Sequence, residues 1–179
     1  MNEQHQRPHP NEYFMGIAMA VRKRANCKGS RVGAVIVHDG WIVATGYNGT
    51  PSDMENCEDG GCHRCASREK FDTGTGYDLC ICVHAEQNAI ASAARLGIAI
   101  EGSIVYTTMR PCFNCTKELL QARIKAVYYL HEWNPSKSDL EAEYKKIQAR
   151  FPGGIRKLQM EDPEIAWAVS SRRRQCLKR

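Results

Sequence analysis

The sequence predicts an α/β fold, a three-layer α/β/α sandwich with a central, mixed, five-stranded sheet. Five short apolar runs have the length of strands, and helical patterns separate the last three of them. A strand–helix–strand step favours parallel pairing, whereas the first two runs flank Asp39-Gly40, a dipeptide typical of an antiparallel hairpin. The 179 residues, 42% of them hydrophobic and 25% charged, suit a single domain over 1–179.

The N-terminal half begins with a predicted helix and hairpin. Apolar residues recur at helical spacing after Asn11, which predicts a helix from an N-cap at Asn11 to about Asn26. The hairpin strands are expected at 33–37 and 41–45. A stretch rich in Gly, Pro, Asp and Cys then covers about 47–82 and has no periodicity. So long a loop inside a compact domain needs something to pin it, and bound metal would do so.

Helices and strands alternate after this loop. The expected helices cover 84–96, 112–122, 140–150 and 163–179, and the expected strands cover 104–109, 126–130 and 155–160. Asp162 precedes Pro163, and this pair predicts the cap and first position of the last, basic helix. The chain contains no internal repeat and no linker that would divide it in two.

The net charge of +5 is concentrated at the C-terminus. The basic residues there are Arg172, Arg173, Arg174, Lys178 and Arg179. They indicate either a patch for nucleotides or nucleic acid, or a solvated helix end, and we favour the second interpretation. The polar N-terminus predicts no secretory signal, and the apolar runs are too short for a membrane helix. We therefore expect a cytoplasmic protein.

Two short motifs carry the chemistry, His84-Ala85-Glu86 and Pro111-Cys112-Phe113-Asn114-Cys115. One histidine and two cysteines provide three ligands, the number that a catalytic zinc keeps while its fourth position holds water. Glu86 lies close to this metal without being obliged to bind it, so its carboxylate is the candidate for moving protons. The alternative is a structural zinc site, which a fourth nearby ligand would normally close.

A second group of cysteines predicts another metal site. Its members are Cys27, Cys57, Cys62, Cys65, Cys80 and Cys82. Two close pairs plus outliers are typical of metal ligands, and we expect zinc rather than disulfides. Because one tetrahedral zinc takes four thiolates, either two cysteines are spare or two ions are bound. We favour one structural ion and leave its ligand set open; ordinary reduced cysteines are the alternative.

Together the motifs resemble a known family. The H-x-E…P-C-x-x-C spacing matches the signature of zinc deaminases, in which the glutamate is not a ligand. The stretches 29–37, 84–90 and 106–112, and above all Gly46-Tyr47-Asn48-Gly49-Thr50-Pro51, resemble the deoxycytidylate deaminases of the cytidine deaminase superfamily. The resemblance covers about Arg24 to Leu130. It implies a cytidine deaminase-like fold and hydrolysis of dCMP to dUMP and ammonia, which supplies pyrimidine nucleotide for dTMP synthesis.

The resemblance also implies roles for particular residues. Asn48 should reach the sugar, and the loop with Gly46, Tyr47 and Gly49 should bind a nucleotide effector. Members carry a structural zinc with ligands at positions resembling Cys27, Cys57 and Cys82. They assemble as homo-oligomers, commonly hexamers, which dCTP activates and dTTP inhibits.

Arg31 and Arg110 are candidates for the substrate phosphate, because Arg110 precedes the second motif and guanidinium groups bind phosphate well.

Two other functions share some of these features. A tRNA or polynucleotide base deaminase would use the same metal chemistry, and the basic tail gives it some support. A zinc-ribbon module that binds nucleic acid without turnover is the non-enzymatic alternative. The stretch 46–51 and the cysteine-rich loop favour a mononucleotide substrate over nucleic acid.

Overall fold

A mixed five-stranded sheet forms the centre of the protein. The computed structural model describes residues 7–71, 75–135 and 138–170. The strands are β1 (Gly33–His38), β2 (Trp41–Tyr47), β3 (Ile104–Met109), β4 (Ala126–His131) and β5 (Ile155–Lys157), and their order in the sheet is β2-β1-β3-β4-β5. Strand β1 is antiparallel to β2 and β3, whereas β4 is parallel to β3 and β5. The predicted mixed sheet is confirmed.

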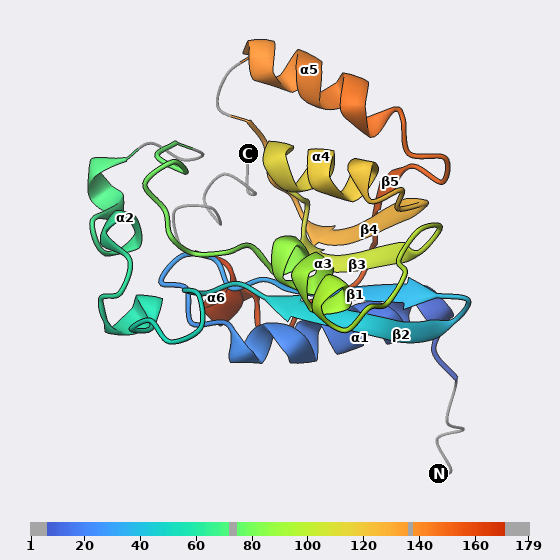
Figure 1. The fold of residues 1–179 in the computed structure, drawn as a ribbon, viewed down its shortest axis with the longest axis horizontal. Coiled ribbons are helices and arrows are strands. Elements are labelled where there is room, and N and C mark those ends of the chain that lie inside the picture. The colour runs from blue at the N-terminus through green and yellow to red at the C-terminus, as the bar shows by residue number, and fades with distance from the viewer. Residues whose placement is uncertain (1–6, 72–74, 136–137, 171–179) are drawn as a thin grey trace.

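Helices cover both faces of this sheet (Figure 1). The longer ones are α1 (Pro10–Val21), α3 (Ala85–Arg95), α4 (Phe113–Gln121) and α5 (Ser138–Gln148). Helix α1 packs on β1 and β3 from one side, and α3 packs on β1 and β2 from the other. Helix α4 lies beside α3, and α5 packs on its outer side. The architecture is therefore the predicted three-layer sandwich.

The central strand β1 explains why both faces must be covered. Because side chains alternate along a strand, Ala34 and Ile36 face the α3 and α4 side, while Val35 and Val37 face α1. All four side chains are buried. Burial on both faces gives a continuous apolar run in place of the alternating pattern of a strand with one wet face.

Local signals place the hairpin correctly but misplace the first N-cap. Asp39 and Gly40 both have positive φ, 47° and 83°, as a two-residue hairpin turn requires. Helix α1 begins at Pro10 and its N-cap is His9, whose side chain accepts the backbone N–H of Asn11. The predicted cap at Asn11 is wrong, because Pro10 lacks the N–H and has the φ that suits the first helical position.

Helix α1 also ends earlier than expected. It stops at Val21, one 3₁₀ turn covers Arg22–Arg24, and Ala25 is already extended. The predicted continuation to Asn26 is wrong because Arg22 turns inward and is fully buried in a cluster of charged groups.

The last helix is much shorter than predicted. Helix α6 covers only Ile165–Ala168, and Val169 is extended. The predicted helix is therefore wrong at 163–164 and at 169–170, because Glu164 and not Asp162 is the N-cap. Its remainder, with the basic residues 172–179, lies outside the described residues. The Ala168 carbonyl accepts the backbone N–H of Arg31, so it is not available to a further helical turn. None of the helices in the described part of the chain is long and apolar enough to span a membrane.

Close packing of β2 on α3 depends on Gly46. A Cβ at this position would lie 2.1 Å from the Ala85 carbonyl oxygen and 2.4 Å from the Ala89 nitrogen. Both atoms are backbone, so β2 and α3 would have to separate. We expect Gly46→Ala to lower the free energy of unfolding by at least about 1–3 kcal/mol, the usual cost of overpacking. Chemical denaturation monitored by circular dichroism measures this loss.

Gly16 provides the matched control, since a Cβ there meets nothing within 4 Å inside helix α1. Gly16→Ala should raise stability by about 0.4–1 kcal/mol. Equal stability of the two variants would contradict the close approach at Gly46.

Candidate active site

The motifs at 84–86 and 111–115 lie at the starts of two neighbouring helices, α3 and α4, and so come together. His84 is the N-cap of α3, and its backbone N–H donates to Gln87. Cys112 is the N-cap of α4, and Cys115 lies in the first turn of that helix. Nδ1 of His84 lies 3.3 Å from Sγ of Cys115 and 3.4 Å from Sγ of Cys112. The structure thus brings together the three predicted ligands, although the histidine and the first cysteine are 28 positions apart in the chain.

These three atoms have the chemistry and spacing for zinc. A tetrahedral zinc with usual Zn–N and Zn–S bonds would hold nitrogen and sulfur about 3.5 Å apart. The observed distances of 3.3 and 3.4 Å are close to this value. Within the described residues, the group that could hold an ion here consists of His84, Cys112 and Cys115 and does not include Glu86. Three ligands are typical of a catalytic zinc site.

Packing from α5 supports the start of α4. The Tyr144 hydroxyl donates to the Pro111 carbonyl, and Tyr144 is fully buried. The Thr116 hydroxyl donates to the carbonyls of Pro111 and Cys112 from the helix side. The turn that carries Cys112 is therefore held on both sides.

The electrostatics of the site favour a thiolate. A hydrogen bond from Cys115 is the main cause that lowers the pKa of Cys112 to about 4; burial opposes it and His84 adds to it. Burial alone would lower the pKa of His84, but the hydrogen bond and charge of Cys112 outweigh it and raise that pKa to about 9. A thiolate is the form that binds metal, so zinc binding would release the proton from the imidazole.

Glu86 lies in the first turn of α3 and is 4% exposed. Its Oε1 accepts a hydrogen bond of 3.1 Å from the Thr107 hydroxyl on β3. Burial raises the pKa of Glu86, the His84 charge lowers it, the Cys112 charge raises it, and the net shift is upward. A buried carboxylate with a raised pKa beside three candidate metal ligands is a candidate proton carrier.

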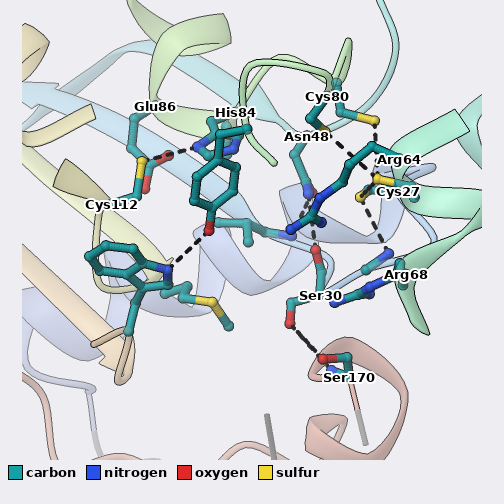
Figure 2. A pocket seen from close by; sticks show the side chains of 18 of the residues that line it. Cys27, Ser30, Asn48, Arg64, Arg68, Cys80, His84, Glu86, Cys112 and Ser170 are labelled. Atoms are coloured by element: carbon teal, nitrogen blue, oxygen red, sulfur yellow. Dashed lines mark hydrogen bonds between the residues drawn. The ribbon is translucent and has the colours of Figure 1, made fainter. Parts of the chain in front are cut away.

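A pocket runs from this group to the cysteine-rich loop (Figure 2). His84, Glu86 and Cys112 line one end. Arg64 and Arg68 line the other end beside the second cysteine group, and Asn48 and Ser30 lie between the two ends; Cys27 and Cys80 also line the far end. The pocket is therefore long enough to touch both metal-ligand groups and carries two cations opposite the catalytic end.

Asn48 lines this pocket and also shapes its wall. Its Oδ1 accepts the backbone N–H of Val32 at 2.7 Å, and its Nδ2 donates to the Ser30 carbonyl at 2.9 Å. Each end of the amide keeps one further hydrogen-bonding position. Asn48 can therefore hold segment 30–32 and bind a sugar hydroxyl at the same time, and its predicted role stays a prediction.

The two arginines chosen from the sequence are occupied by protein groups. Arg31 donates to the Ala25 carbonyl and to Glu58, stacks on Trp167, and does not line the pocket.

Arg110 does line the pocket, but its guanidinium donates to Trp133, Asn134 and Gln148 and stacks on Tyr144.

The arginines of the far end, Arg64 and Arg68, were not among the predicted site residues. Arg64 is 9% exposed, donates to the Thr75 carbonyl, and lies over the rings of Tyr77 and Phe71. Arg68 donates to the Lys28 carbonyl at 3.2 Å. The available signal was their position within and just after Cys62-His63-Arg64-Cys65, which puts cations next to a metal-ligand group.

The predicted effector residues lie apart from the pocket. Gly46 is buried against α3, and Gly49 is buried against Asn26. Tyr47 is 37% exposed at the end of β2. None of the three lines the pocket within the described residues. Their role in effector binding stays a prediction.

All six cysteines of the second group lie together in one buried cluster, although they come from separate parts of the chain. Its members are Cys27, Cys57, Cys62, Cys65, Cys80 and Cys82. The fold thus brings together every candidate ligand of the second metal site.

Comparison with known proteins identifies the family. Residues 8–131 match the "Cytidine and deoxycytidylate deaminase zinc-binding region" family, which is more than half of the chain. The chain belongs to this deaminase family. The resemblance predicted from the motifs is confirmed.

Relatives in this deaminase family include two fungal deoxycytidylate deaminases. That of Schizosaccharomyces pombe is 40% identical over 134 residues and that of Saccharomyces cerevisiae is 39% identical over 123 residues. These matches cover 75% and 69% of the present chain, but only 41% and 38% of the two fungal proteins. The chain thus matches about two fifths of the length of these relatives.

Two phage proteins are matched over nearly their whole length. The deoxycytidylate deaminase of Mycobacterium phage D29 is 36% identical over 132 residues, which are 70% of this chain and 98% of the phage protein. The dCMP deaminase from the cyanophage S-TIM5, solved in complex with dCMP and dUMP, has a TM-score of 0.63 and 30% identity. That match covers 86% of this chain and 100% of the phage chain.

Proposed function

We propose that this deaminase-family chain hydrolyses dCMP to dUMP and ammonia with one zinc at its active site. The observation that carries this proposal is a buried carboxylate, Glu86, directly beside a three-ligand group of His84, Cys112 and Cys115 at the end of a pocket. The names of the relatives support dCMP as the substrate. Its product would supply pyrimidine nucleotide for dTMP synthesis.

The residues of this chain have separable roles in the reaction. His84, Cys112 and Cys115 would hold the zinc, which supplies a nucleophilic water at neutral pH by lowering its pKa to about 7. Glu86 would accept a proton from the attacking water and pass it to the ring nitrogen and to the leaving amino group. The Thr107 hydroxyl donates to Oε1 of Glu86 and so helps to orient this carboxylate.

The opposite end of the pocket suits the 5′-phosphate. Arg64 and Arg68 place two cations there. The catalytic end contributes sulfur, imidazole and carboxylate groups, and its one arginine, Arg110, is held by Trp133, Asn134 and Gln148. Asn48 lies between the two ends, where the sugar would be. A nucleotide with its base at Glu86 would therefore place its sugar near Asn48 and its phosphate near the arginines, because guanidinium groups bind phosphate strongly.

A substrate panel tests this proposal. Ammonia release should be measured side by side with dCMP, CMP, deoxycytidine and short single-stranded oligonucleotides, using protein with a measured zinc content. We expect dCMP to react best, and deoxycytidine, which lacks the phosphate, to react poorly. Reaction of oligonucleotides alone would support the polynucleotide deaminase instead. No reaction from zinc-loaded protein that binds nucleic acid would favour the zinc-ribbon module.

We expect Arg68→Gln to lower kcat/KM for dCMP about 10-fold to 100-fold, which corresponds to the loss of a charged hydrogen bond. Activity with deoxycytidine should change little, because that substrate has no phosphate to bind. The measurement is steady-state kinetics with both substrates. Arg95→Gln is the control, since Arg95 is exposed in α3 and does not line the pocket. Equal losses with both substrates would show that Arg68 does not act through the phosphate.

The assembly and regulation of the protein are also proposals. The resemblance supports a homo-oligomer, with a hexamer as the expected form, activated by dCTP and inhibited by dTTP. It also supports a cytoplasmic location. The exposed Trp41 on the edge strand β2 offers an apolar surface that an oligomer could cover.

A further inference from the structure

Four separate segments contribute sulfur atoms to the buried cysteine cluster. Cys27 follows α1, Cys57 opens the turn η2 (Cys57–Asp59), Cys62 and Cys65 belong to α2 (His63–Ala66) and its N-cap, and Cys80 and Cys82 precede α3. Five of the six are buried and Cys80 is half-buried. The loop that the sequence left without periodicity is folded back on itself around these six sulfurs.

The sulfur atoms form two overlapping groups of four. One group is Cys27, Cys57, Cys65 and Cys82, and the other is Cys62, Cys65, Cys80 and Cys82. Within each group all sulfur atoms lie within 4.8 Å of one another. Both groups contain Cys65 and Cys82, so two members are shared.

The distances between the sulfurs match the edges of zinc–thiolate tetrahedra. With Zn–S bonds of about 2.3 Å, two sulfurs on one tetrahedral zinc lie about 3.8 Å apart. The pairs Cys27–Cys65, Cys62–Cys80 and Cys65–Cys80 are each separated by 3.8 Å, and Cys65–Cys82 by 4.0 Å. The first of these pairs belongs to the first group, the next two belong to the second group, and Cys65–Cys82 belongs to both. Each group therefore contains sulfur separations that suit a tetrahedral zinc.

A disulfide and a single-ion site both fit this geometry less well. A disulfide requires sulfurs about 2.05 Å apart, far shorter than the observed separations. A single tetrahedral ion would use four thiolates and leave two cysteines without a role. Those two, either Cys27 and Cys57 or Cys62 and Cys80, lie as close to Cys65 and Cys82 as the ligands do.

We propose that the six cysteines bind two divalent metal ions in one cluster, in which the thiolates of Cys65 and Cys82 bridge the ions. Zinc is the metal that four-thiolate sites typically bind, and sharing two ligands gives each ion four. Each thiol loses its proton to solvent on binding. Six thiolates and two divalent cations leave a net charge of −2, whereas two independent four-thiolate sites would need eight cysteines and would carry −4.

Groups around the cluster suit this residual negative charge. The backbone N–H of Lys28 points to the sulfur of Cys57 at 3.4 Å, and that of Gly29 points to Cys27 at 3.3 Å. The guanidinium of Arg68 adjoins Gly29 beside Cys27. Hydrogen-bond donors and cations next to the sulfurs are typical partners of a metal–thiolate centre.

Counting the metal tests the number of ions. Protein purified under reducing conditions should contain three zinc ions per chain, measured by native mass spectrometry and by elemental analysis. Cys57→Ser and Cys62→Ser should each lose one ion, because each removes a ligand that belongs to one group alone. The double variant should lose two, whatever the occupancy of the catalytic group. His63→Ala is the matched control: this exposed side chain lies between two ligands and belongs to neither group.

A single-ion site gives a different result. The double variant would then lose at most one ion relative to the unmodified protein, and one of the single variants would lose none. Either outcome overturns the proposal. Alkylation in denaturant with chelator and without reductant provides a further check. All nine cysteines of the chain should react, and a pair that resists alkylation would show a disulfide and also overturn the proposal.

A separate experiment tests whether the two ions share thiolate ligands. When the zinc is replaced by cadmium-113, two ions that share thiolates should show spin coupling to each other in the cadmium NMR spectrum. Two cluster signals without coupling would show separate ions and overturn the bridged arrangement. Cys65→Ser should reduce the metal content by two, because it removes a ligand of both ions. If that variant does not fold, the cadmium spectrum of the unmodified protein still decides the question.

Discussion

Glu86→Gln is expected to lower turnover of dCMP at least about 10²-fold to 10⁴-fold, the usual contribution of a positioned general acid–base group. The amide keeps the shape of the side chain and can still accept the hydrogen bond from Thr107, but it cannot carry a proton. Zinc content should stay unchanged, because Glu86 is outside the three-ligand group. Initial rates and elemental analysis on the same preparation measure both effects.

The same chemical change at an exposed position is the control. Glu101 is exposed and pairs with Arg123 away from the pocket, so Glu101→Gln should keep full activity. If Glu86→Gln lost zinc together with activity, Glu86 would be a ligand and its assignment as proton carrier would be wrong. If activity persisted, another group would have to move the protons.

The catalytic group is predictable from the sequence because each half of it is local. His84 and Glu86 are two residues apart, and Cys112 and Cys115 are three apart. Both pairs lie at helix starts, where the spacing alone fixes which side chains point in one direction. Only the packing of α3 beside α4 is not local in the sequence. The pattern of strands and helices predicts a layered sandwich, in which these two helices can lie side by side.

The proposed phosphate end is not predictable in the same way. Arg110 adjoins the second motif in sequence and Arg31 lies in the stretch 29–37, but the fold directs their guanidinium groups to carbonyl and carboxylate oxygens. Arg64 and Arg68 lie in the aperiodic loop, and they line the pocket beside the six sulfurs that the fold gathers from distant segments. Local patterns say nothing about such long-range contacts.

The last helix shows how a tertiary contact changes the use of a local signal. Asp162 before Pro163 is a good helix start by local criteria, and Asp162 does accept the backbone N–H of Glu164. Its carboxylate also accepts hydrogen bonds from Arg22 and His131, residues far away in sequence. The Asp162 carboxylate therefore binds mainly the buried side chains of Arg22 and His131. The helical segment that follows it is one turn long.

This charged cluster leads to the largest expected change in stability. Arg22 is completely buried, and its guanidinium donates two hydrogen bonds to Asp162, at 2.5 and 2.7 Å. We expect Asp162→Asn to lower the free energy of unfolding by about 3–5 kcal/mol, because it leaves a buried cation without its main partner. Denaturant titration of both proteins at neutral pH measures the difference.

The same pair predicts a pH dependence. Burial alone would raise the pKa of Asp162, but the hydrogen bonds from Arg22 and His131 outweigh it and lower the pKa to about 2. Since the pKa is lower in the folded state, the contribution of Asp162 is complete above its unfolded pKa of about 4. It is lost as the pH falls from about 4 to 2. Asp162→Asn should therefore flatten the stability profile in that interval.

Two further variants decide whether the unpaired charge is the cause. Asp39→Asn makes the same change at a side chain that is 90% exposed, and should stay within about 0.5 kcal/mol of the unmodified protein. Adding Arg22→Met to Asp162→Asn removes the buried cation, so the double variant should be more stable than Asp162→Asn alone. A double variant that is less stable than Asp162→Asn would show that the unpaired charge of Arg22 is not the cause of the lost stability.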